Sequence, residues 1–159
     1  MIGALLALTI APLAPRAAAA ADVGYQDGGY SGSAPTAREP QSKLWFNDGT
    51  WWASMYSSAA GAVDIHRLNW ATQTWSDTGV RIDERSSSFA DTLWDGSKLY
   101  IVTGVSDQSL SCSPSTSGDN SIRILRFSYD TGTKTYTLDT GYPVTIATLK
   151  VQSVSISKD

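Results

Sequence analysis

Two long segments of this chain repeat the same series of short phrases in the same order. Residues 42–79 and residues 91–141 both contain Leu-Trp, Asp-Gly, an aromatic residue, a long turn, an apolar run, Thr-x-Thr-aromatic and Asp-Thr-Gly. A third copy begins at Val151. A repeat of this length that is built from strands is typical of a β-propeller. The sequence therefore predicts an all-β fold, a partial β-propeller of about two four-stranded antiparallel blades and the start of a third.

The turn signals place the expected strands. Asp-Gly pairs tolerate the positive φ that tight hairpins need, and they occur at residues 48–49 and 95–96. We expect blade one at about 41–82, blade two at about 90–146 and a third blade from about 151, after a Gly-, Ser- and Pro-rich lead-in at 22–40. The predicted strands are 43–46, 50–56, 63–69 and 74–78 in blade one, and 92–94, 98–103, 121–129 and 134–138 in blade two.

Both faces of the expected strands carry apolar groups. In residues 121–129, Ile122 and Ile124 fall on one face, whereas Leu125 and Phe127 fall on the other. A sheet that lies between two neighbouring sheets needs this pattern. Trp75 and Tyr136 follow equivalent turns, and we expect both to pack between blades.

A closed propeller has four to eight blades, so two copies and a fragment predict an incomplete ring. We expect the chain to be an N-terminal fragment, with further blades of the same longer protein as its partners. Residues 1–21 are predicted to be a signal peptide, because an apolar run leads into small residues. The expected location is outside a bacterial cell or on its surface.

Charge excludes some partners. The formal net charge is −3 and the chain has no basic cluster, so we expect no nucleic-acid binding and no membrane association beyond export. Cys112 is the single cysteine and His66 the single histidine. No metal-ligand spacing is visible around His66, and the sequence predicts neither a metal site nor a cofactor.

The run KLWFNDGTWWASMY, followed by DIHRLNWATQTWSDTG and LWDGSKLYIVTG, resembles secreted bacterial β-propellers of the sialidase-like and kelch-like kind. The resemblance covers about residues 38–159 and implies a multi-bladed propeller. Sialidase blade turns carry Ser-x-Asp-x-Gly-x-x-Trp, whereas Asp and Gly are adjacent here. The resemblance offers Arg38 as the first arginine of a carboxylate clamp, and the remaining catalytic residues would lie in downstream blades.

Equivalent positions of the repeat supply one set of candidate ligand-binding residues. Ser42, Asp91 and Ser153 enter the inner strand of each copy, and inner strands line the central channel of a propeller. They could bind a ligand there or only hydrate the channel. Glu84 and Arg85, in the segment between the two blades, could contact a substrate, or they could belong to a solvated loop.

Aromatic side chains supply a second set. Trp51, Trp52 and Trp94 could stack against sugars, with core packing as the alternative. The functional hypothesis is an exported module that binds a glycan or a protein partner without catalysis. The alternative is a sialidase-like glycoside hydrolase, and a third possibility is a fragment with no independent function.

Overall fold

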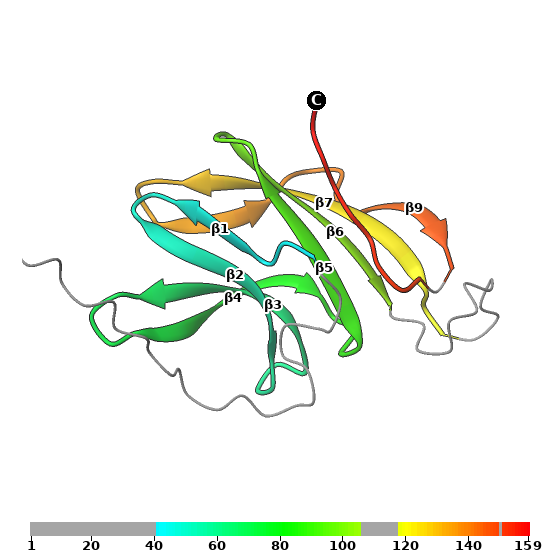
Figure 1. Cartoon of the computed structure of the whole chain (residues 1–159), viewed down its shortest axis with the longest axis horizontal. Coiled ribbons are helices and arrows are strands. Elements are labelled where there is room, and N and C mark those ends of the chain that lie inside the picture. Colours follow the sequence, from blue (N-terminus) through cyan, green and yellow to red (C-terminus); the bar gives the residue numbers. More distant parts are fainter. Residues whose placement is uncertain (1–40, 106–117, 150) are drawn as a thin grey trace, which may run out of the picture.

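The computed structural model describes residues 41–105, 118–149 and 151–159, which form nine β-strands and no helix (Figure 1). No helix in these residues is therefore long and apolar enough to cross a membrane. The strands are β1 (Leu44–Asn47), β2 (Thr50–Ser57), β3 (Ala62–Asn69), β4 (Thr74–Asp83), β5 (Ser88–Trp94), β6 (Lys98–Val105), β7 (Ser121–Asp130), β8 (Thr135–Leu138) and β9 (Val144–Thr148).

The strands form two antiparallel sheets, each built from strands that follow one another along the chain. The first sheet has the order β1-β2-β3-β4, and the second has the order β5-β6-β7-β8, with β9 paired to β7. The all-β class and the two antiparallel sheets, which contain the eight predicted strands, are as expected from the repeat. Both sheets are open rather than closed on themselves.

Two strands are at least four residues longer than predicted, and one was missed. β4 continues past residue 78 to Asp83 because Thr78 and Gly79 form a bulge between the pairs His66–Asp77 and Ile65–Val80. Gly79 has a φ of 73°, which suits a bulge as well as the end of a strand, which we expected at residue 78. β5 begins at Ser88 rather than at residue 92. β9 was not predicted; it pairs with the first half of β7.

The hydrophobic core lies between the facing sides of the two sheets. Eleven buried residues form it: Trp45, Trp52, Val63, Ile65 and Ile82 from the first sheet, and Ala90, Leu99, Ile101, Leu125, Phe127 and Tyr136 from the second. Trp75 pairs with Leu68 on the opposite side of the first sheet and is only partly buried. Tyr136 therefore packs between the two sheets as expected, whereas Trp75 faces away from the second sheet, and no described residue of another sheet covers it.

Tyr136 is the centre of an aromatic cluster in this core. Its ring lies edge-on to Trp52, with 5.0 Å between the centroids, and is also edge-on to Trp45 and Trp94. Its hydroxyl accepts hydrogen bonds from Trp45 Nε1 at 2.8 Å and Asn47 Nδ2 at 2.9 Å. Burial raises the pKa of Tyr136 to about 12, so the hydroxyl stays protonated at neutral pH.

The residues after Val151 cross the outer face of the second sheet, the face turned away from the first (Figure 1). A Cβ at Gly104 would meet Val151 and Val154 side chains at 3.2 and 3.4 Å. Val151 N donates to Val105 O at 3.4 Å, and Ile156 N donates to Asp91 Oδ2 at 2.8 Å. The segment thus covers β5 and β6 without forming a strand of its own.

Replacing Tyr136 by Phe should destabilise the fold, because Trp45 Nε1 would lose its acceptor in the core. An unsatisfied buried donor costs about 1 to 3 kcal/mol. Urea unfolding measures the loss, and Tyr142→Phe is the matched control, since no hydrogen bond of its hydroxyl is seen among the described residues. Equal stability of the two variants would contradict the role of the Tyr136 hydroxyl.

Candidate functional site

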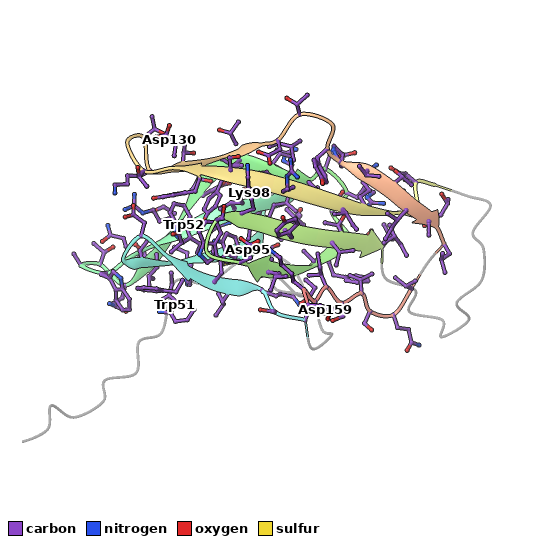
Figure 2. The ribbon with its side chains drawn as sticks, turned by 90° about the horizontal axis from the view of Figure 1, so that it is seen from above. Trp51, Trp52, Asp95, Lys98, Asp130 and Asp159 are labelled. Carbon is purple, nitrogen blue, oxygen red and sulfur yellow. The ribbon has the colours of Figure 1, made fainter. Side chains whose placement is uncertain are left out.

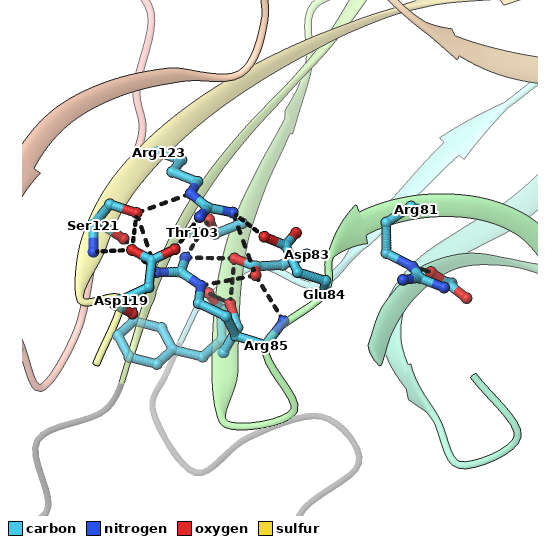
Figure 3. A network of polar contacts seen from close by, with 11 residues as sticks. Arg81, Asp83, Glu84, Arg85, Thr103, Asp119, Ser121 and Arg123 are labelled. Atoms are coloured by element: carbon cyan, nitrogen blue, oxygen red, sulfur yellow. Dashed lines mark hydrogen bonds and ion pairs between the residues drawn. The ribbon is translucent and has the colours of Figure 1, made fainter. Parts of the chain in front are cut away.

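The segment between the two sheets places Arg85 against Asp83 at the end of β4 (Figure 3). Arg85 Nη2 lies 2.5 Å from Asp83 Oδ2, and Arg85 Nε donates to Asp83 Oδ1 at 2.8 Å. Arg85 Nη1 also donates to the carbonyl oxygens of Ser121 at 2.7 Å and Asp119 at 3.1 Å. The Arg85 side chain is only 11% exposed. Its donors are therefore engaged in joining the segment to β7.

A second arginine completes this network. Arg123 on β7 binds Glu84 Oε1 at 2.9 Å, contacts Asp119, and lies 3.8 Å from Asp83. Burial opposes ionisation of Asp83, but the hydrogen bonds from Arg85 outweigh it and hold the pKa of Asp83 below its usual value. A hydrogen bond from its own backbone N–H, then one from Arg123, lowers the pKa of Glu84. Both groups are thus ionised at neutral pH, whereas a general acid needs a raised pKa.

Asp91 ties three segments of the chain together. Its Oδ1 accepts from Ser42 N at 2.5 Å, and its Oδ2 accepts from Ile156 N. Ser42 O in turn accepts from Thr92 N at 2.8 Å and from Thr92 Oγ1 at 2.9 Å. Of the three predicted inner-strand residues, the structure brings Ser42 and Asp91 together. Ser153 is exposed, and Ile156 rather than Ser153 meets Asp91.

The three candidate tryptophans lie in different environments. Trp52 is completely buried in the core, and Trp94 is partly buried beside Tyr136. Trp51 points to the opposite side of the first sheet and is 38% exposed (Figure 2). Among these three, Trp51 offers the most ring surface to a ligand. Arg38, Cys112 and the predicted signal peptide lie outside the described residues.

A pocket at one end of the first sheet was not found from the sequence. It encloses about 460 Å³ beside the β1–β2 and β3–β4 turns. Its lining residues are Asp48, Gly49, Thr50, Arg67, Leu68, Asn69, Trp70 and Ser76. Trp70 is 51% exposed, and its Nε1–H donates to Gly49 O at 3.3 Å. The sequence does contain a signal for this pocket, a tryptophan directly before the Ala71-Thr72-Gln73 turn. A side chain at a turn has no core to pack into, so this ring is expected to be exposed.

The pocket contains Arg67, a cation that lies beside the ring of Trp52. The guanidinium of Arg67 lies 5.5 Å from the centroid of the Trp52 ring, and no carboxylate in the described part of the chain pairs with it. Asp48 Oδ2 instead accepts from Tyr129 at 2.7 Å and from Lys134 at 2.5 Å. These hydrogen bonds, that of Lys134 first, lower the pKa of Asp48. The pocket therefore offers a cation, an ionised carboxylate and an exposed indole.

Metal binding finds no support in the described ranges, where no three His, Cys, Asp or Glu side chains come together as ligands. His66 is buried, and its Nδ1 lies 3.2 Å from Asp64 O. The chain matches no protein-family profile, no curated protein and no solved structure.

Replacing Asp83 by Asn should destabilise the protein at neutral pH by about 3 to 5 kcal/mol, because Arg85 would stay buried without its counter-charge. The pKa of Asp83 is lower in the folded than in the unfolded state. Its contribution is therefore complete above the unfolded pKa, about 4, and is lost as pH falls through the folded value.

The measurement is the free energy of unfolding from pH 7 down to acid, and the variant should show a shallower acid loss than the wild type. Glu84→Gln is the control, since this neighbouring carboxylate is 61% exposed and should contribute less than about 1 kcal/mol. A loss no greater in Asp83→Asn than in Glu84→Gln would contradict the assignment.

Proposed function

We propose that the two sheets are successive blades of a propeller-type repeat, and that the chain is an exported module that binds a glycan without catalysis. The hairpins support the repeat. β1 and β2 turn at Asp48-Gly49, and β5 and β6 turn at Gly96-Ser97, where Asp95 N donates to Lys98 O. The repeated Asp-Gly pair therefore lies one residue earlier in the second hairpin than in the first. Aligning these turns matches Trp52 with Tyr100. In the third strand of each sheet, these two residues pair with Arg67 and Arg126.

The alignment also supports packing in one direction, as in a propeller. Trp52 faces the second sheet, whereas Tyr100 is on the face that the C-terminal segment crosses. Lys158 lies over the Tyr100 ring, with its Nζ 5.9 Å from the ring centroid. Each sheet thus presents the same face to the segment that follows it in the chain.

The pocket beside Trp70 is the observation that carries the binding proposal. An exposed indole offers a flat apolar surface on which a sugar ring can stack. The Nε1–H of this indole is held by Gly49 O in the β1–β2 turn. Arg67, Ser76 and the Asn69 side chain add polar atoms around it. Asn69 Oδ1 already accepts from Ala71 N at 3.0 Å, which fixes the orientation of the amide. Ligand pockets combine placed polar groups with apolar surface, and in this pocket the polar residues outnumber the apolar ones.

The described residues do not favour the alternative of glycoside hydrolysis. That reaction requires two carboxyl groups, one of them a general acid with a raised pKa. Asp48 is the carboxylate in the pocket, and its pKa is lowered. Between the sheets, the pKa values of Asp83 and Glu84 are lowered as well. Arg38, the arginine that the sialidase resemblance offers, is outside the described residues.

A glycan array screened with the purified protein tests the proposal. Arg67→Ala should weaken binding of the selected glycan at least about tenfold, equivalent to about 1.4 kcal/mol. The matched control is Arg126→Ala, which removes an arginine at the equivalent register position of the second sheet and should leave affinity unchanged. If no glycan binds, or if Arg67→Ala binds like the wild type, the proposed site is wrong.

A further inference from the structure

An apolar stripe crosses the outer face of the first sheet, the side turned away from the second sheet. Leu44 and Phe46 on β1 are each 50% exposed, and Trp51 on β2 is 38% exposed. Phe46 and Trp51 pair across the two strands and their rings meet edge-on, with 5.4 Å between the centroids. Leu68 on β3 and Trp75 on β4 continue the stripe, because they pair with each other on the same face.

The positions of the second sheet that correspond to this stripe lie in the hydrophobic core. Aligning the two hairpins, as the proposed repeat requires, matches Trp51 with Leu99 and Leu68 with Phe127. Leu99 and Phe127 pair with each other, and both are completely buried against the first sheet. The stripe therefore has the side-chain character of a sheet-packing face, although no described residue of a further sheet covers it. A patch of large apolar side chains at such positions indicates an interaction surface.

The complementary face is present on the same chain. What packs against Leu99 and Phe127 is the face of the first sheet that carries Trp52 and Arg67. Its equivalent in the second sheet is the outer face with Tyr100 and Arg126. A second copy of the chain therefore offers the surface that the stripe requires, and the two surfaces are different, as in a head-to-tail contact.

One segment of the chain competes for that face. Residues 151–159 lie on β5 and β6 through Ile156 N on Asp91, Lys158 on Asp95, and Val151 N on Val105 O. Besides these polar contacts, the segment forms one β-bridge at Val151 and places the Val151 and Val154 side chains at Gly104, but it adds no strand to the sheet. Asp91 Oδ1 binds Ser42 N in the contact between the two sheets, and its Oδ2 binds Ile156 N in the segment. The segment thus binds the same aspartate that the next sheet would approach.

We propose that this chain associates head to tail with a second copy, the apolar stripe of one first sheet docking on the outer face of the other copy's second sheet, in competition with residues 151–159. This rests on the proposed equivalence of the two sheets, but not on glycan binding. Heterologous contacts close into rings when the rotation permits. A propeller ring of four to eight sheets would contain roughly two to four copies of a two-sheet chain.

Sedimentation velocity of the full chain over a wide concentration range measures this association. The wild type should shift from monomer toward a discrete oligomer as concentration rises, and Trp51→Ser should abolish the shift. Ile146→Ser is the matched control, since Ile146 is an apolar residue on β9 that is 55% exposed and lies outside the stripe. Near-ultraviolet circular dichroism of Trp51→Ser checks that the core is intact.

Ile156→Pro tests the competition, because it removes the N–H that binds Asp91 and leaves the stripe unchanged. Loss of one hydrogen bond of about 1 kcal/mol should tighten association roughly fivefold. Monomers at every concentration for both wild type and Ile156→Pro would overturn the proposal, as would association that Trp51→Ser does not change. Glycan binding by the monomer is measured separately, so failure of one proposal leaves the other standing.

Discussion

The fold depends on aromatic packing between the two sheets. Trp52 has no exposed surface and lies edge-on to both Tyr129 and Tyr136, which come from the β7–β8 hairpin of the other sheet. The packing removes the facing apolar sides of both sheets from water, which is the main source of their stability. The Tyr136 hydroxyl adds direction to this contact, since it accepts from two residues at the end of β1.

Polar side chains then fix the position of the two sheets relative to each other, at both ends of the interface between them. Asp91 uses both carboxylate oxygens on backbone N–H groups of other segments, and this fixes β1 and the C-terminal segment on either side of β5. At the other end of the interface, Arg85 and Arg123 bind the β4–β5 connection to β7. Asp91 and Arg85 were candidates for ligand binding in the sequence, whereas Arg123 was not. Their partners indicate that they mainly hold the two sheets in one arrangement.

The periodicity of the sequence and its turn residues predicted most of the strands, and tertiary contacts determined the others. The Asp48-Gly49 turn, with φ values of 51° and 74°, fixes the first hairpin from two residues. The bulge at Thr78-Gly79 could not be separated from a terminating turn, because glycine at positive φ suits both. β9 carries no repeat signal, and it forms because the first half of β7 has an unpaired edge beyond β8.

The candidate site was harder to predict than the fold. An exposed and a buried tryptophan are adjacent in Trp51-Trp52, and only the register of β1 and β2 with the second sheet tells them apart. Trp70 stands outside the alternation of the strands, so strand patterning assigned it no role. Both partners of Asp91 and the Ser121 partner of Arg85 lie 36 to 65 residues away along the chain, and no local pattern identifies them.

Native-state hydrogen exchange tests most directly whether the two sheets share one core. If Trp52 and Tyr136 hold both sheets in a single unit, the slowest amides of β2 and β3 should open with the same free energy as those of β6 and β7. That value should equal the global free energy of unfolding. The account would be contradicted if the amides of one sheet opened at a clearly lower free energy than those of the other. One sheet would then unfold while the other stayed folded.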